Sequence, residues 1–299
     1  MIPLLVVSLA LGSAARAQSP AVERAGPRCV SDISDEEAAE IGQKIWQYEG
    51  GGKILVWWDD TGECPSFGIN NYLWFQQGHK ASFEESFPPL IDFMLSKGAD
   101  VPKWMRSKPP APWRTRAELF GESVVPEHIR TNPPKNWAMT PEMFALQDSP
   151  RIAELKGFLG RTVALQARYS VRRMIDSLPK MLADVPKPER PAVERQFYRV
   201  ACSRGGLFDL VDYVNFKGEG TNPNERYKSP GGQMQGWGLL QVLQHMSGEG
   251  SGPAALKEFA DAAEWAMRRR VDNAPAERRE GDRRWLDGWI KRIRNYRGD

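Results

Sequence analysis

The stretch Ser34–Gly52, SDEEAAEIGQKIWQYEGGG, decides the fold of this chain. It opens with a serine that is followed three positions later by Glu37, which is typical of a capping box at a helix start. Apolar residues then recur at helical spacing, and the glycines from position 50 predict the helix end. The next position after Ile41 and Ile45 on the same face is Glu49. A carboxylate is therefore expected where a core residue would stand.

Such a carboxylate suits the cleavage of a glycosidic bond. That reaction uses one carboxylic acid that donates a proton to the leaving oxygen, and a second polar group that acts on the anomeric carbon or on water. Burial on an apolar helix face favours the protonated acid, so Glu49 suits the first role. The alternative is a helix-terminal glutamate that is exposed beside the glycines.

The residues after this helix predict a small hairpin or three-stranded sheet. Lys53–Trp58 and Ser66–Phe75 are strand-like, and a turn lies between them. Asp60, in that turn, would stay ionised in solvent and suits the second role. Ser66, at the start of the following strand, can position a water molecule.

The rest of the chain is expected to be mainly helical. We predict a helix over Ser82–Lys97, an irregular surface connection over Val101–Pro134, and a long helix from Pro150 to about Leu178 that crosses between two lobes. Further helices are predicted at Arg190–Ala201, Gly206–Phe216, Trp237–Met246, Pro253–Val271 and Arg283–Tyr296. The expected fold class is mainly α with a small β part, as one two-lobed domain. Its sheet-bearing lobe covers about residues 30–145 and its helical lobe about residues 146–299.

A second polar block lies in the predicted helical lobe. It offers hydrogen-bonding and stacking groups beside glycines, as an extended sugar chain would need. These candidate substrate-binding residues are Tyr213, Asn215, Glu219, Gln235 and Trp237. We expect them to face Glu49 across a cleft, and the alternative is a polar turn that packs one helix on another.

The N-terminus and the composition predict an exported protein. Residues 1–17 form a short apolar run that ends in Ala15-Arg16-Ala17, which is typical of a cleaved signal peptide. The mature chain, 18–299, is therefore expected in the periplasm or outside the cell, without a stable membrane anchor, as a monomer. The 41 basic and 38 acidic residues are interspersed, which argues against a nucleic-acid partner.

The cysteines and histidines give little indication of a chemical function. The three cysteines allow at most one disulfide, and their pairing stays open: Cys29, Cys64 and Cys202. The three histidines stand far apart from one another: His79, His128 and His245. Because neither set has metal-ligand spacing, no metal and no other cofactor is predicted.

The order of these motifs resembles the pattern of phage-type lysozymes. That pattern is a catalytic glutamate at a helix end, an aspartate in a hairpin, and Thr-Ile-Gly-x-Gly-His. By this resemblance Glu49 corresponds to the acid, Asp60 to the carboxylate that helps to activate water, and Ser66 to the threonine that holds it. Asn70 and Asn71 stand where the pattern has its second glycine and histidine.

The chain is also similar, over most of its mature length, to a family of uncharacterised exported bacterial proteins with a lysozyme-like fold. The landmarks of this similarity are Ile45–Glu49, Ser66–Phe75, Phe83–Pro88, Asp212–Gly220 and Gln235–Gln241. Members carry Asn at the position of Asp60, so the resemblance supports Glu49 more strongly. It implies a muramidase that hydrolyses the glycan strand of peptidoglycan in a cleft between the lobes.

Two other functions stay open. A lytic transglycosylase would use Glu49 alone, and a cell-wall glycan-binding protein would use no catalytic residue. For an inverting hydrolase, the carboxyl group of Asp60 or Glu63 is expected about 6.5–9.5 Å from that of Glu49.

Overall fold

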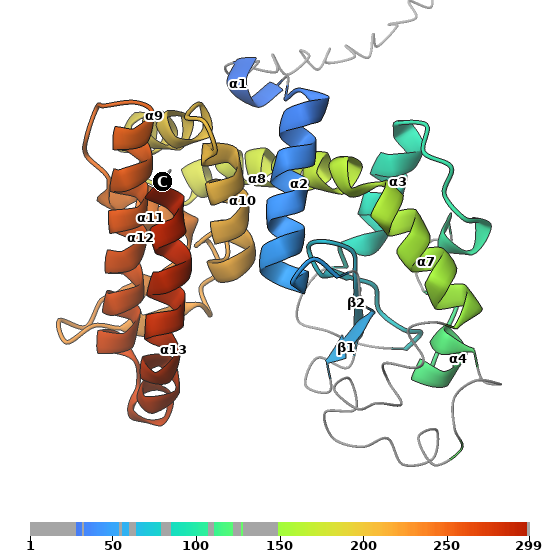
Figure 1. The fold of residues 1–299 in the computed structure, drawn as a ribbon. Coiled ribbons are helices and arrows are strands. Elements are labelled where there is room, and N and C mark those ends of the chain that lie inside the picture. The colour runs from blue at the N-terminus through green and yellow to red at the C-terminus, as the bar shows by residue number, and fades with distance from the viewer. Residues whose placement is uncertain are drawn as a thin grey trace, which may run out of the picture.

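The computed structural model describes residues 28–31, 33–53, 56–59, 64–78, 85–106, 111–121, 127 and 149–297. Helices dominate this described part, and two small antiparallel sheets complete it (Figure 1). The predicted class, mainly α with a small β part, is confirmed. Among the described helices, none combines the length and the apolar character that a membrane crossing requires. The predicted signal peptide, residues 1–17, lies outside the described residues.

The elements follow one another in two groups along the chain. The first group is α1 Arg28–Ser31, α2 Asp35–Gly50, β1 Trp57–Asp59, β2 Cys64–Phe67, β3 Tyr72–Leu73, α3 Phe87–Ser96, η1 Lys103–Arg106 and α4 Arg116–Phe120. The second is α7 Pro150–Arg161, α8 Val163–Ala183, α9 Arg190–Ala201, α10 Gly206–Lys217, β4 Arg226–Lys228, β5 Met234–Gly236, α11 Leu239–His245, α12 Pro253–Asn273, α13 Ala276–Arg294 and η3 Asn295–Arg297.

Helix α2 begins and ends as its sequence predicts. The Ser34 side chain accepts a hydrogen bond from the Glu37 backbone N–H at 3.0 Å. Gly51 ends the helix in the left-handed region at φ 57°, a conformation that glycine adopts without a steric penalty. The apolar face is buried as expected, with Ile41 and Ile45 at most 4% exposed. The position of Glu49 at the last turn is thereby set.

The predicted strands form the three-stranded alternative. The order is β1-β2-β3, antiparallel throughout, with Ser66 opposite both Trp57 and Leu73. The second sheet, β4 with β5, lies between α10 and α11 and was not predicted. Each of its strands has three residues, too few to show an alternating pattern in sequence.

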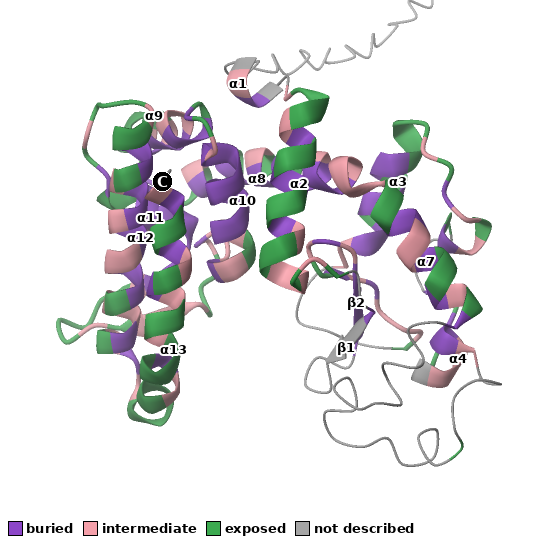
Figure 2. Cartoon of the chain, viewed as in Figure 1, coloured by how far each residue is buried: buried purple, intermediate pink, exposed green. Residues whose placement is uncertain are grey.

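Helix α8 joins two hydrophobic cores. The first core lies between α2, α8 and the helices from α9 to α13, and the second lies between the three-stranded sheet, α3, α4 and α7. Val171 of α8 belongs to the first core and Tyr169 to the second. Figure 2 shows the buried faces of these helices turned inward. The boundary between the two cores therefore does not fall near residue 145 of the sequence. Helix α2, before that point, contributes to the first core, and α7, after it, contributes to the second.

The predicted long helix is broken at Thr162, between α7 and α8. Thr162 leaves the helical region at φ −114°, and its hydroxyl donates to the Phe158 carbonyl at 2.9 Å. Two consecutive β-branched residues, Thr162 and Val163, lower the helix propensity at this point. The break lets α7 pack on the second core while α8 crosses to the first.

The prediction of a surface connection over Val101–Pro134 is wrong for its described part. Val101, Trp113 and Leu119 are fully buried in the second core. The rings of Trp113 and Trp74 meet edge to face with centroids 4.5 Å apart. Aromatic rings bury large apolar areas, so this proline-rich segment packs inward and contributes to the core.

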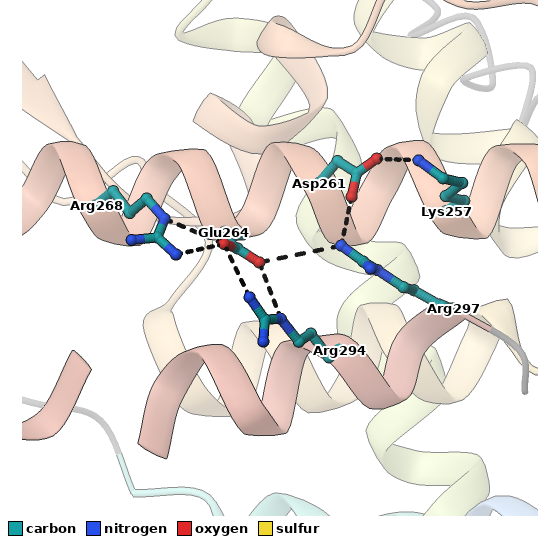
Figure 3. Close-up of polar contacts among 6 residues, drawn as sticks. All are labelled: Lys257, Asp261, Glu264, Arg268, Arg294 and Arg297. Atoms are coloured by element: carbon teal, nitrogen blue, oxygen red, sulfur yellow. Dashed lines mark hydrogen bonds and ion pairs between the residues drawn. The ribbon is translucent and has the colours of Figure 1, made fainter. Parts of the chain in front are cut away.

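Ion pairs lie along the contact between α12 and the two elements that follow it, α13 and η3. Figure 3 shows the residues involved: Lys257, Asp261, Glu264, Arg268, Arg294 and Arg297. Glu264 lies within ion-pair distance of arginines from α12, α13 and η3, of which Arg268 Nη2 is closest at 2.6 Å. The Arg268 and Arg294 side chains are largely exposed, and such pairs contribute little free energy each.

A disulfide joins the N-terminal helix to the helical lobe. Cys29 of α1 pairs with Cys202, which follows α9, across 173 positions of sequence. Cys64 lies buried in β2, outside the disulfide. The structure thus settles the cysteine pairing that the sequence left open.

Helices α2 and α8 lie close together at Gly42. A Cβ atom at this position would lie 2.7 Å from Val163 Cγ1 and 3.0 Å from the Val163 carbonyl oxygen. Both distances are shorter than van der Waals contact, and one of the atoms belongs to the backbone. The crossing therefore requires a glycine.

We predict opposite effects for two glycine substitutions inside helices. Gly42→Ala should lower the free energy of unfolding by about 1–3 kcal/mol, because the methyl group overpacks the crossing. Gly281→Ala in α13, where no heavy atom lies within 4 Å of the added Cβ, should raise it by about 0.5–1 kcal/mol. Urea unfolding of both variants beside the wild type measures this. Equal effects of the two substitutions would contradict the close crossing.

Candidate functional site

Glu49 lies in the last turn of α2, where two other parts of the chain reach it. Its Oε1 accepts a hydrogen bond from Arg292 Nη2 of α13 at 2.5 Å. Its Oε2 accepts from Asn71 Nδ2, in the turn between β2 and β3, at 3.2 Å. The Glu49 side chain remains 21% exposed. One carboxylate thus links α2, the sheet and α13 while it stays accessible to solvent.

The turn that carries Asn71 is anchored to α8. The Ile69 backbone N–H donates to Gln166 Oε1 at 3.0 Å, and Gln166 is fully buried. A Cβ atom at Gly68 would lie 2.3 Å from the same oxygen, so only glycine fits there. Asn71 is the only described non-glycine residue with positive φ, at 50°, a region that asparagine tolerates. The turn is therefore held in a single conformation beside Glu49.

Asn70 connects this turn to two helices. Its Nδ2 donates to Ser170 Oγ of α8 at 3.2 Å, and its Oδ1 accepts from Asn215 Nδ2 of α10 at 2.5 Å. The Ser170 hydroxyl also bonds the buried hydroxyl of Tyr72 at 2.6 Å. Asn215 is exposed. Polar groups from the sheet, α8 and α10 therefore converge next to Glu49.

Arg292 is fixed by a buried aspartate on α10. Its Nε and Nη2 bond Asp212 at 2.9 and 2.6 Å, and the Asp212 side chain is 2% exposed. The Tyr296 hydroxyl donates to the same carboxylate at 2.5 Å. Burial lowers the pKa of Arg292, but hydrogen bonding to Asp212 and the charges of Asp212 and Glu49 raise it overall, so the guanidinium stays charged. We call Glu49, Asn71, Asp212 and Arg292 the Glu49 site.

The surroundings of Glu49 differ from the expected apolar ones. The apolar face of α2 ends at Ile45, and one turn later the carboxylate meets the Arg292 guanidinium and the Asn71 amide. A guanidinium stabilises a negative charge through a charge-assisted hydrogen bond. Glu49 is therefore paired with a cation in this structure.

Of the other two predicted catalytic residues, only Ser66 belongs to the part of the chain that the structure describes. Asp60 and its alternative Glu63 lie outside the described residues, so the expected distance to Glu49 stays a prediction. Ser66 lies in the central strand of the sheet and is 6% exposed.

Within the second block of predicted residues, the contacts of Asn215 lead to the turn beside Glu49, whereas Tyr213 and Trp237 belong to the first core. Asn215 contacts Asn70, as described. Tyr213 is fully buried and its hydroxyl donates to the Trp237 carbonyl at 2.7 Å, while Trp237 itself is 6% exposed. Glu219 Oε1 lies 3.8 Å from Lys180 Nζ of α8. Gln235 Oε1 accepts from Asn273 Nδ2 of α12 at 2.8 Å.

Sequence reasoning missed Asp212 and Arg292. Asp212 carried a usable signal, because it and Asp209 interrupt the largely apolar run of α10, GLFDLVDYVNF. Arg292 carried none, because it is one of many arginines in α13. Its role follows only from the packing of α13 against α10.

Lys217, at the end of α10, is a buried amine near this site. It is 8% exposed, and its Nζ lies 3.9 and 3.4 Å from the ring centroids of Phe216 and Trp289. Burial, with the charges of Arg270 and Arg292, lowers the pKa of Lys217 to about 6, although Asp282 opposes this. The amine is thus held largely neutral at neutral pH.

The comparisons with known proteins add no family to this description. The chain matches no protein-family model, no curated protein and no solved structure. Among the described residues, no group of three or more His, Cys, Asp or Glu side chains is placed to hold a metal ion.

Removing Arg292 should be costly because it leaves the buried Asp212 carboxylate without a cationic partner. We predict that Arg292→Met lowers the free energy of unfolding by about 3–5 kcal/mol. The double variant with Asp212→Asn should lose less than the sum of the two single losses. Urea unfolding of the four proteins measures this coupling. Arg294→Met, whose exposed side chain pairs with Glu264, is the control and should cost at most about 1 kcal/mol. Additive losses at Arg292 and Asp212 would refute the pairing.

Lys217 should make stability depend on pH. An unfolded lysine has a pKa of about 10.4, so between pH 6 and 10 the unfolded chain binds one more proton than the folded chain. This contribution makes stability increase with pH over that window. Lys217→Met should therefore stabilise the protein more at pH 6 than at pH 9, measured by urea unfolding. The exposed Lys187→Met is the control and should show no such difference. An effect of Lys217→Met that is independent of pH would refute the buried neutral amine.

Proposed function

We propose that this chain is a lysozyme-like enzyme that cleaves the glycan strand of peptidoglycan, with Glu49 as the proton donor. One observation carries the proposal: Glu49 stands at the end of α2, bonded to the turn of a three-stranded antiparallel sheet, beside the helix that joins two cores. This is the place that the resemblance to phage-type lysozymes assigns to the catalytic acid.

The contacts of Glu49 are compatible with proton donation. Arg292 Nη2 binds both Glu49 and Asp212, whereas Arg292 Nε binds Asp212 alone. Glu49 can therefore leave Arg292 without leaving the guanidinium unpaired. In the proposed reaction, a glycan that binds beside Asn71 displaces Glu49 from Arg292, and the exposed carboxyl group takes a proton that it then donates to the leaving oxygen.

A hydrolase needs a second group that activates water, and Asp60 is proposed for this role. A lytic transglycosylase is the second candidate, because it needs only one carboxylate. This alternative is favoured by the state of Asp212, whose two oxygens are both bonded to Arg292 and one also to Tyr296, so that it is not available as a base. The proposed location is the periplasm or the outside of the cell, in agreement with the predicted signal peptide.

We predict that Glu49→Gln abolishes cleavage of purified sacculi. General acid catalysis contributes about a hundredfold to ten-thousandfold in rate, and the glutamine amide cannot act as the acid that protonates the leaving oxygen. The fold should persist, because Arg292 keeps both bonds to Asp212. Release of soluble glycan fragments, followed by mass spectrometry, measures the rate and identifies the products. Reducing ends indicate a hydrolase, and anhydro-muramyl ends indicate a transglycosylase.

Two controls make this test specific. Glu280→Gln replaces an exposed glutamate on α13 and should retain the wild-type rate. Ser66→Ala should slow cleavage less than Glu49→Gln does. If the wild type binds sacculi without releasing fragments, and Glu49→Gln binds equally well, the protein is a glycan-binding protein and the catalytic proposal fails.

A further inference from the structure

A second site is formed by a hollow of about 460 Å³ between α2, the start of α10 and the end of α13. This volume is within the range of about 300–1,000 Å³ that is common for small-molecule sites. A neighbouring hollow of about 290 Å³ shares Glu40, Lys44 and Arg204 with it and continues along α2 to Ser34. Helices α2 and α10, which flank it, lie side by side in Figure 1. Together the two hollows form an elongated depression, which we call the Asp209 hollow.

The innermost lining of the Asp209 hollow holds one carboxyl group among apolar and aromatic surfaces. Asp209 is 4% exposed, and Phe208, Leu256 and Tyr296 beside it are equally buried. Among the described residues, no side chain forms a hydrogen bond or ion pair with the Asp209 carboxyl group. A buried carboxylate is costly unless a donor or a cation meets it. This group therefore lacks a partner that a ligand can supply.

Burial raises the pKa of Asp209 well above its usual value. Lys44 opposes this shift and Asp212 adds to it. Lys44 itself is held at the rim, with its Nζ 5.4 Å from the Phe208 ring centroid. The nearest cation thus acts on Asp209 through its field and not by direct contact.

The rim of the hollow carries charges that are open to a ligand. Lys44 and Arg204 are exposed and make no ion pair with any described residue, and Tyr48 presents a ring beside Phe208 with centroids 5.5 Å apart. The lining also includes Arg294 and, along α2, Glu36, Glu37 and Glu40. Lys44 and Arg204 at the mouth, with the Asp209 carboxyl group below them, match a molecule that has a positive end and a negative end. The elongated shape fits a molecule longer than a single amino acid.

We propose that the Asp209 hollow binds a short peptide with free termini, whose ammonium group meets Asp209 and whose carboxylate meets Lys44 and Arg204. An ammonium group supplies the donors that Asp209 lacks, and the two rim cations supply charge-assisted hydrogen bonds to a carboxylate. The site uses none of the contacts of Glu49, so it does not depend on the proposed glycan cleavage.

Calorimetric titration of the full chain with alanylalanine tests this proposal. Binding is expected for the free dipeptide, and binding at least tenfold weaker for its N-acetyl form and for its C-terminal amide. Asp209→Asn should weaken binding of the free dipeptide by roughly tenfold to a hundredfold. Arg204→Ala, an exposed substitution that leaves the interior intact, should weaken it severalfold. Asp176→Asn on the surface of α8 is the matched control and should bind as the wild type does.

Three results would overturn the proposal. They are no binding of the free dipeptide, equal binding of the N-acetyl form, or unchanged affinity in both Asp209→Asn and Arg204→Ala. Glu49→Gln should retain dipeptide binding whether or not it has lost glycan cleavage. The two proposals therefore fail separately.

Discussion

The close crossing of α2 over α8 at Gly42 is the contact on which the rest of the structure depends. Helix α2 carries Glu49, and α8 carries Gln166 and Ser170, which hold the turn between β2 and β3. If the two helices stood further apart, Glu49 and Asn71 would lose their hydrogen bond. Because Gly42 has no side chain, the two helices approach closely, and this sets the distance between the Glu49 carboxylate and the sheet.

The Glu49 site lies where two cores meet, and this explains its mixture of buried and exposed groups. Asp212 and Tyr296 belong to the interior of the helical core, whereas Glu49, Asn71 and Asn215 reach solvent. Arg292 spans the two environments, with its Nε on the buried aspartate and its Nη2 shared with Glu49. The Arg292 guanidinium, which is held by the buried Asp212, therefore binds the Glu49 carboxylate, which is accessible to solvent. The two bonds from Arg292 to Asp212 do not involve Glu49.

Helix α10 carries two buried aspartates one turn apart whose surroundings differ. Asp212 is bonded by Arg292 and Tyr296, while Asp209 faces a hollow and has no described partner. The charge of Asp212 disfavours the ionisation of Asp209. Arg292 and Tyr296 satisfy the Asp212 carboxylate within the protein. The Asp209 carboxyl group is the one that we propose binds a ligand. The same helix thus supports a structural ion pair and a candidate binding site.

The sequence by itself determined most local structure and the position of Glu49. The caps of α2, the start of α7 at Pro150 and the bounds of α9 follow from capping residues and from 3.6-residue periodicity, which act over one or two turns. Only the tertiary structure decided which groups surround Glu49. Arg292 lies 243 positions from Glu49 in the sequence, and no local pattern distinguishes it from the other arginines of α13. The inward packing of Trp113 and the Cys29–Cys202 pairing likewise have no local signal in the sequence. Each depends on contacts between distant segments, whose free energy exists only once the helices have packed.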